Sequence, residues 1–218
     1  MAEPHAHAGT HAFGDAFRKE VARRLAGFTR MPAGPETAGL TRAAVAIALT
    51  RSLDGSGEAT FLLTRRTDRL RAHGGQWALP GGRCDDGETA IEAALRELEE
   101  ELAVCLDPSS VLGLLDDYPT RSGYLITPVV VWAGADPTVS INPGEVASVH
   151  RIRIADIMRP DVVEFVTIPE SARRVIRLIM NGVRVHAPTA AMIYQLREML
   201  AGRTTRVDQM EQPVFAWR

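Results

Sequence analysis

Residues 82–104 read GRCDDGETAIEAALRELEEELAV, and this is the most informative pattern in the chain. At about 100° per residue, it predicts a helix from about Glu88 to Ala103 with one apolar stripe that must pack on a sheet. The stripe consists of Ile91, Ala94, Leu95, Leu98 and Leu102. Glu97, Glu100 and Glu101 fall on one flank at i, i+3 and i+4, so three carboxylates share one helical face.

The three clustered carboxylates are unfavourable in a helix built for stability alone. Like charges at i, i+4 cost roughly 0.2–0.5 kcal/mol per pair, and anions near a helix C-terminus oppose the macrodipole. One interpretation is a solvated acidic face, which is the commonest role of a charge run. The other is a divalent-cation site, because clustered carboxylate oxygens are the ligands that Mg²⁺ and Mn²⁺ require. The acidic helix by itself leaves both interpretations open.

The spacing of particular residues favours the cation site. Gly82 is followed after five residues by Glu88, and Glu88 is followed after seven by Arg96-Glu97-Leu98-Glu99-Glu100-Glu101-Leu102-Ala103-Val104. This order resembles the Nudix box, G-x5-E-x7-R-E-U-x-E-E-x-G-U with U aliphatic, except that Ala103 stands where the box has Gly. Because Ala is a strong helix former, we expect the helix to run slightly longer at Ala103.

The resemblance implies a metal-dependent site on this helix. Glu97 and Glu101, with Glu100 beside them, resemble the family's metal ligands. The implied cofactor is Mg²⁺ or Mn²⁺, which would polarise a diphosphate and lower the pKa of an attacking water. Glu97 could instead deprotonate that water, and Glu100 is a further catalytic candidate. Gly81 and Gly82 are expected to form a tight turn that approaches metal and substrate phosphate, where a Cβ would obstruct.

Two further features of the box are predicted to be structural. Asp85 and Glu88 have the spacing of a capping box and are expected to cap the helix N-terminus, with a second role open for Glu88. Arg96 is expected to pair with Glu92 or Glu88, and it would thereby orient the preceding loop against the helix.

A glutamate from a later loop often completes such a site. Glu145, in the segment Asn142-Pro143-Gly144-Glu145, stands at a turn just before a predicted strand and is the third catalytic candidate. The alternative is an ordinary surface turn residue, and the sequence does not separate the two.

The segment before the box resembles the coenzyme A pyrophosphatase branch of the Nudix enzymes, whose signature is L-L-T-x-R-[SA]-x3-R-x3-G-x3-[FW]-P-G-G. The matching residues are Leu62-Leu63-Thr64-Arg65-Arg66-Thr67, Arg71, Gly75 and Pro80-Gly81-Gly82. Thr67 replaces the usual Ser or Ala, and Leu79 replaces an aromatic residue. Branch members often carry Ala at the position of Ala103. They commonly carry a Trp-Gly before a Thr-Ala, where this chain reads Val185-His186-Ala187-Pro188-Thr189-Ala190. This departure concerns the region expected to shape the pocket for the pantetheine arm.

A substrate of that branch requires a basic group remote from the metals, because coenzyme A carries a 3′-phosphate in addition to its diphosphate. Arg65, Arg66, Arg69 and Arg71 supply guanidinium groups in one short stretch, and a guanidinium can bind phosphate bidentately. Arg66 and Arg71 match the signature and are the predicted substrate-binding arginines. Surface positions at a strand end are the alternative, which we expect for at least two of the four.

The rest of the pattern predicts an α/β (α+β) fold. Strands are expected at 43–50, 59–65, 111–116, 124–132 and 146–154, and helices at 13–28, 168–180 and 189–200. The resemblance implies a Nudix α/β/α sandwich with a mixed β-sheet and added N- and C-terminal helices. We divide the chain into an N-terminal tail, helix and linker (1–38), a Nudix hydrolase domain with closing helices (39–203) and a C-terminal tail (204–218).

Composition limits the possible partners and the compartment. The formal net charge of −2 gives no reason to expect nucleic-acid or anionic-membrane binding. Cys84 and Cys105 are too few for a disulfide framework and are expected to be free thiols. No signal-peptide core and no apolar run of membrane-spanning length is found, so we expect a cytoplasmic protein. The extra apolar helices are compatible with a homodimer.

The sequence therefore predicts a metal-dependent pyrophosphohydrolase of a small nucleotide-diphosphate substrate. By resemblance, hydrolysis of coenzyme A or acyl-CoA would give 3′,5′-ADP and (acyl-)4′-phosphopantetheine. The nearest alternative is another Nudix activity, on ADP-ribose, a dinucleotide or a nucleotide sugar. A non-catalytic Nudix-like binding module is the alternative from a different class, but such modules usually lose the box glutamates that this chain retains.

Overall fold

A mixed eight-stranded sheet forms the centre of the structure, a computed structural model that describes residues 11–31, 34–68, 74–180 and 182–216. Its strands are β1 (Thr41–Arg51), β2 (Ala59–Arg66), β3 (Trp77–Ala78), β4 (Gly81–Arg83), β5 (Val111–Leu114), β6 (Tyr118–Pro119), β7 (Tyr124–Trp132) and β8 (Val146–Arg153). The central order is β3-β2-β1-β7-β5, with β4 paired to β1, β6 to β7 and β8 to β2. Only the β1–β7 pairing among these is parallel, so the mixed sheet that the sequence predicts is confirmed.

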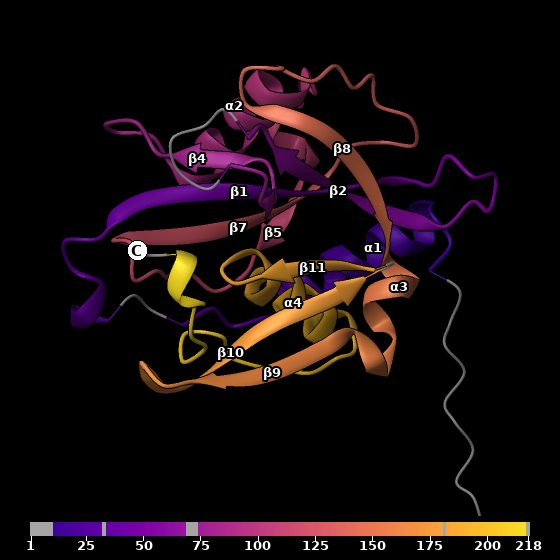
Figure 1. Cartoon of the computed structure of the whole chain (residues 1–218). Coiled ribbons are helices and arrows are strands. Elements are labelled where there is room, and N and C mark those ends of the chain that lie inside the picture. Colours follow the sequence, from indigo (N-terminus) through magenta and orange to yellow (C-terminus); the bar gives the residue numbers. More distant parts are fainter. Residues whose placement is uncertain (1–10, 32–33, 69–73, 181, 217–218) are drawn as a thin grey trace, which may run out of the picture.

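The composition of β1 explains how both faces of this sheet are covered. Its alanines face one side and pack with the apolar residues of α2 (Ala90–Leu102), whereas its larger side chains face the other side. The two sets are Ala44, Ala46 and Ala48 against Val45, Ile47 and Leu49. Small side chains let the helix lie close to the sheet, and α2 accordingly covers one face in Figure 1.

The opposite face is covered by two helices from the ends of the chain and by a second sheet. Helix α1 (Asp15–Ala26) buries Phe17, Val21 and Leu25 in the core that the larger side chains of β1 also line. Helix α4 (Thr189–Leu200) joins the same core and has the bounds that the sequence predicts. In Figure 1 these helices lie on the side of the sheet away from α2, which confirms the layered α/β architecture with helices added at both ends.

The prediction of a helix at 168–180 is wrong. Residues Ser171–Met180 form β10, the middle strand of an antiparallel sheet with β9 (Val163–Ile168) and β11 (Val183–His186). A short helix, α3 (Ile154–Met158), connects this sheet to β8. Within β10 the buried positions Ile176, Leu178 and Met180 alternate, as they do in a half-buried strand, and they pack in the α4 core. A short apolar run is compatible with both a helix and a strand. Here, pairing with β9 and β11 makes this segment a strand.

Residues beyond α4 also pack into the structure. Val207, Glu211 and Gln212 are buried, and Tyr118 Oη donates a hydrogen bond to the backbone oxygen of Met210 at 2.9 Å. At the other end, the rings of Phe13 and Trp132 stack with centroids 4.2 Å apart. Both terminal segments therefore contribute contacts to the core.

The predicted strands and the two free cysteines agree with the structure. The predicted strands at 43–50, 59–65, 111–116, 124–132 and 146–154 correspond to β1, β2, β5, β7 and β8, with ends shifted by no more than a few residues. Both cysteines are free thiols. No helix within the described ranges is long and apolar enough to cross a membrane.

Candidate functional site

Three glutamates converge at one end of α2. Ligand oxygens of Glu97, Glu101 and Glu145 all lie within 4.8 Å of one another. Glu97 and Glu101 stand one turn apart on the helix, and Glu101 is only 2% exposed. Three carboxylates at this separation repel one another unless protons or a cation neutralise them. We refer to these three residues as the glutamate cluster.

Glu145 reaches the cluster because its loop is tied to the end of α2. The backbone nitrogen of Asn142 donates to the Glu101 carbonyl at 2.8 Å, which satisfies an acceptor that the last helical turn leaves free. The Glu145 nitrogen donates to the Asn142 carbonyl at 3.0 Å, and the Glu145 carbonyl accepts from Thr67 at 2.9 Å. These bonds fix the turn before β8 against the helix.

Glu100 is not part of the glutamate cluster. Its side chain is 55% exposed, and its carboxylate accepts a hydrogen bond from the Arg96 guanidinium at 3.0 Å. The sequence placed Glu100 among the metal ligands and the catalytic candidates, whereas the structure brings Glu145 into the cluster in its stead.

Arg96 connects the helix to the loop that precedes it. Its guanidinium donates to Glu88 at 2.9 Å, to Glu97 at 2.9 Å and to the backbone oxygen of Arg83 at 3.0 Å. Of the two partners that the sequence offered, Arg96 contacts Glu88, while Glu92 bonds to Thr89 instead. The pKa of Arg96 is raised, first by its hydrogen bonds to Glu88, so it stays cationic and holds the Glu97 carboxylate in place.

The N-terminal cap of α2 differs from the prediction. Thr89 and Glu92 form a capping box, in which the Thr89 hydroxyl accepts from the Glu92 nitrogen and the Glu92 carboxylate accepts from the Thr89 nitrogen. Asp85 and Glu88 have the same spacing, but their contact closes the turn before the helix: Asp85 nitrogen donates to Glu88 at 2.8 Å. Glu88 is therefore free of the capping role and pairs with Arg96.

The helix also ends earlier than expected. Ala103 takes the left-handed conformation, with φ 54° and ψ 26°, so α2 stops at Leu102 rather than running longer. The Ala103 nitrogen bonds to the Glu99 carbonyl, and Val104 bonds back to Leu98. This turn buries Val104. Gly, which the Nudix box has at the position of Ala103, would adopt the left-handed conformation at a lower cost in free energy.

Gly81 and Gly82 form a strand rather than the tight turn that we expected. They belong to β4, which pairs with Ala44 and Val45 of β1. The expectation that a Cβ would obstruct is confirmed: at Gly82 it would lie 2.2 Å from a Glu97 oxygen, and at Gly81 2.3 Å from the Ala44 carbonyl oxygen. The backbone of β4 therefore lies directly against the glutamate cluster.

The electrostatics of the cluster suit a divalent cation. Burial raises the pKa of Glu101 to about 7, and Glu97 and Glu145 add to the rise, while Arg66 and the Gly81 N–H act against it. Burial also raises the pKa of Glu97, although Arg96 opposes the shift. A metal bound by the three carboxylates would replace the protons that the free cluster must otherwise hold. The oxygen donor set is the one that Mg²⁺ or Mn²⁺ prefers.

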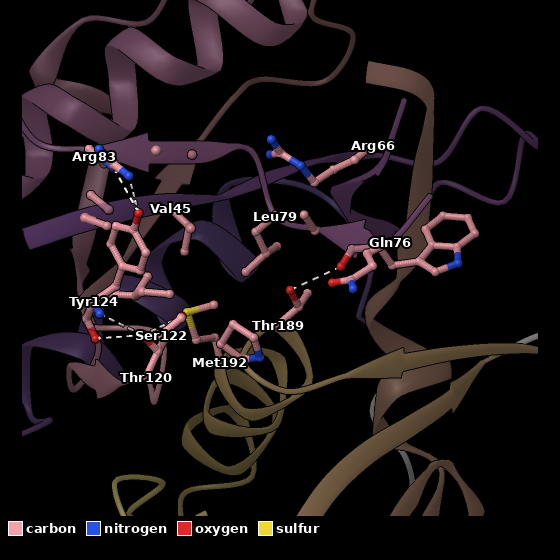
Figure 2. A pocket seen from close by; sticks show the side chains of 18 of the residues that line it. Val45, Arg66, Gln76, Leu79, Arg83, Thr120, Ser122, Tyr124, Thr189 and Met192 are labelled. Carbon is pink, nitrogen blue, oxygen red and sulfur yellow. Dashed lines mark hydrogen bonds between the residues drawn. The ribbon is translucent and has the colours of Figure 1, made fainter. Parts of the chain in front are cut away.

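A pocket of about 330 Å³ opens on the other side of β4 (Figure 2). Its middle is apolar, with Val45, Leu79 and Met192 in the lining. Arg66 and Arg83 lie on opposite sides of these residues in Figure 2. Gly81 and Gly82 line the pocket and also contact the cluster: the Gly81 nitrogen donates to Glu101 at 3.5 Å, and Gly82 lies against Glu97.

The sequence anticipated part of this pocket. Arg66, Gly81 and Gly82 line it as predicted, whereas Arg71 lies outside the described residues. Arg66 is not remote from the cluster, because its charge acts on Glu101. Sequence reasoning missed Arg83, for which its place next to Gly82 was the available signal. It also missed Gln212, which lines the pocket from a segment without any periodic pattern.

The segment that contains the glutamate cluster is similar to known proteins. A family model for the NUDIX domain matches residues 40–177. A Yersinia enterocolitica (serotype O:8 / biotype 1B) protein named "Uncharacterized Nudix hydrolase NudL" is 43% identical over 103 residues, which cover 47% of this chain and 53% of that protein. One of the same name from Yersinia pestis (strain Pestoides F) is 43% identical over 102 residues, covering 46% of this chain and 51% of that protein. The chain thus spans about half the length of the curated relatives it matches.

Among solved structures, a MutT/nudix family protein from Enterococcus faecalis matches with a TM-score of 0.51 at 15% identity, covering 85% of this chain and 73% of that one. At this identity the likeness concerns the fold alone, and it agrees with the sheet and helix layers described above.

Proposed function

The chain belongs to the NUDIX family, and we propose that it is a metal-dependent pyrophosphohydrolase of a nucleoside diphosphate derivative. The observation that carries this proposal is the glutamate cluster, in which Glu97, Glu101 and Glu145 meet beside the pocket. We infer that these residues hold Mg²⁺ or Mn²⁺. Such a cation, when bound, would polarise the diphosphate and lower the pKa of an attacking water.

The groups of this chain would divide the remaining work. Arg96 donates a hydrogen bond to the Glu97 carboxylate and orients it, and we propose that Glu97 or Glu145 accepts the proton of the attacking water. Arg66, whose charge acts on Glu101, is placed to bind an oxygen of the substrate diphosphate. The apolar residues in the middle of the pocket would hold an uncharged part of the substrate and exclude water from it.

Within this class, we propose coenzyme A or an acyl-CoA as the substrate, with 3′,5′-ADP and (acyl-)4′-phosphopantetheine as products. The proposal rests on the resemblance of the segment from Leu62 to Gly82 to the coenzyme A pyrophosphatase branch. The pocket is in keeping with this substrate, because its lining combines arginines for phosphate groups with apolar residues for an uncharged part of the molecule. Departures near Ala187 stand beside the pocket, where Pro188 and Thr189 line it.

Product analysis by mass tests both levels of the proposal. The protein is incubated with coenzyme A and, separately, with ADP-ribose, in the presence of Mg²⁺ or Mn²⁺ or of a chelator. Wild type, Glu101→Gln and Glu99→Gln are compared; Glu99 is exposed on the same helix and outside the cluster, which makes it the matched control.

Metal-dependent release of 3′,5′-ADP by wild type and Glu99→Gln, but not by Glu101→Gln, is the expected result. Cleavage of ADP-ribose without cleavage of coenzyme A would keep the diphosphate chemistry and reject the substrate. If neither compound is cleaved, and if Mn²⁺ also fails to stabilise the protein against heat, the hydrolase proposal fails.

A further inference from the structure

Within the part of the chain that the structure describes, two arginines in the pocket, half-buried Arg66 and exposed Arg83, have no carboxylate partner. No ion pair joins Arg66 or Arg83 to a carboxylate within residues 11–31, 34–68, 74–180 and 182–216, whereas neighbouring Arg96 pairs with several. The Nε of Arg66 is buried and has no hydrogen-bond partner in the same ranges. Guanidinium groups that face a pocket in this state are suited to bind an anion.

The two arginines occupy different places relative to the glutamate cluster. Arg66 ends β2, and its charge acts on Glu101, so it belongs to the part of the pocket where the diphosphate would lie. Arg83 ends β4, and its side chain turns toward β7, where Nε donates to the Tyr124 hydroxyl at 3.0 Å. Figure 2 shows the two guanidinium groups on opposite sides of the pocket, with Arg83 beside Tyr124.

Tyr124 holds Arg83 in position without neutralising it. The guanidinium carbon lies 5.3 Å from the centre of the Tyr124 ring, and the hydroxyl accepts from both Nε and a terminal nitrogen. A tyrosine hydroxyl that accepts these bonds still has its own proton to donate. At the backbone, the Arg83 carbonyl accepts from Arg96 at 3.0 Å, which fixes the end of β4 to α2. The pair is therefore preorganised and still cationic.

We propose that Arg83 and Tyr124 form a second phosphate site, which recognises a phosphate of the substrate that is not part of the scissile diphosphate. The inference rests on the proposed function: in coenzyme A this group is the 3′-phosphate of the adenosine. Arg83 directly follows Gly82, which lies against Glu97 of the cluster, so a phosphate bound by Arg83 and Tyr124 would lie near the cluster without belonging to the group that the cluster holds. The 3′-phosphate, one ribose away from the diphosphate, meets that requirement.

The nucleotide product allows this site to be tested without catalysis. Binding of 3′,5′-ADP and of 5′-AMP, which lacks the 3′-phosphate, is measured by calorimetry in the presence of Mn²⁺. The variants are Arg83→Gln, Arg83→Lys and the control Arg42→Gln; Arg42 is exposed on neighbouring β1 and does not line the pocket. Melting temperatures are recorded for each variant, since the exposed Arg83 side chain is not expected to be needed for folding.

Wild type is expected to bind 3′,5′-ADP more tightly than 5′-AMP. Arg83→Gln should weaken 3′,5′-ADP binding roughly 10- to 100-fold, the range for a lost hydrogen-bonded charge contact, and leave 5′-AMP binding nearly unchanged. Arg83→Lys should retain part of the preference, because it keeps the charge and loses the bidentate geometry. Arg42→Gln should retain all of it.

Equal weakening of both nucleotides in Arg83→Gln, or no weakening of either, would overturn the second phosphate site. So would a wild type that does not prefer 3′,5′-ADP. The same variants are then assayed on coenzyme A and on dephospho-coenzyme A. A protein that binds 3′,5′-ADP through Arg83 but cleaves neither compound would keep the phosphate site and reject coenzyme A as the proposed substrate, so the two failures are distinguishable.

Discussion

Gly82 and Glu97 lie so close together that a Cβ on Gly82 would stand 2.2 Å from a carboxylate oxygen of Glu97. The contact places the backbone of β4 against the glutamate cluster. Gly81 and Gly82 are adjacent in the sequence, but a Cβ would meet different neighbours at each. At Gly82 the obstructed atom is the end of a flexible side chain, whereas at Gly81 it is the backbone oxygen of Ala44. The two glycines therefore have different roles.

Replacing these glycines by alanine is expected to affect different properties: metal binding at Gly82 and folding stability at Gly81. In Gly82→Ala, the Glu97 carboxylate moves aside, so stabilisation by Mn²⁺ and hydrolysis should be lost while the metal-free melting temperature changes little. In Gly81→Ala, the backbone of β1 or β4 must shift, and we expect a loss of about 1–3 kcal/mol in the free energy of unfolding. Thermal denaturation with and without Mn²⁺ measures both effects. Similar stability losses in the two variants would contradict the assignment.

Substitution by glutamine should reduce activity much more at Glu145 than at Glu100. Glu145→Gln removes a negative charge from the cluster and replaces one carboxylate oxygen by an amide nitrogen. We expect activity to fall by more than about 100-fold, beyond the roughly 10- to 100-fold cost of altering groups that only support ligands. Glu100→Gln should cost less than about tenfold, because Glu100 contacts Arg96 at the exposed edge of the site. Steady-state rates of the two variants and of wild type, measured at saturating Mn²⁺, give the two losses. A larger loss in Glu100→Gln would return Glu100 to the metal site that the sequence predicted.

The metal-free protein should lose stability as the pH rises toward neutrality. The pKa of Glu101 is raised from 4.5 to about 7, chiefly by burial. Between these values the folded state holds more protons than the unfolded chain, so the free energy of unfolding falls with rising pH, by about 3 kcal/mol over this window. The stabilisation is complete below pH 4.5 and is lost above pH 7. The raised pKa of Glu97 acts in the same direction.

Thermal denaturation in a chelator, between pH 5 and pH 8, measures this dependence. Glu101→Gln should show a shallower slope and should be more stable than wild type at pH 8, since an amide does not carry the buried charge. Mn²⁺ should reverse the slope in wild type, because it binds the deprotonated cluster. A slope that Glu101→Gln leaves unaltered would assign the titration to other groups.

Ala103→Gly should stabilise the protein. Ala103 has φ 54°, a left-handed conformation that costs an L-residue roughly 1–2 kcal/mol and Gly much less. Since Gly also gives the unfolded chain more freedom, we expect a net gain of up to about 1 kcal/mol, or roughly 2–4 °C in melting temperature. Ala94→Gly, the same change inside the helix, is the control and should destabilise by about 1 kcal/mol or more. Destabilisation by Ala103→Gly would reject this reading of the turn.

Local spacing explains which parts of the fold could be predicted. Helix α2 has an apolar stripe at helical spacing, and β1, β2 and β7 are continuous runs of buried residues, so the positions of these elements follow from the sequence. The segment Ser171–Met180 was assigned to a helix because a short apolar run fits both periods. Its pairing with β9 and β11 made it a strand. At Ala103, helix propensity favoured a longer helix, and burial of Val104 outweighed it.

The sequence by itself determined the acidic helix, with Glu97 and Glu101 one turn apart, and the glycines that lie against it, since helix geometry and residue size are local properties. Only the tertiary structure decided that Glu145 joins the cluster and Glu100 does not, and that Arg83 faces Tyr124. Those relationships depend on hydrogen bonds and strand pairings between segments distant in the chain. No local pattern specifies them, because each exists only once the sheet has brought its partners together.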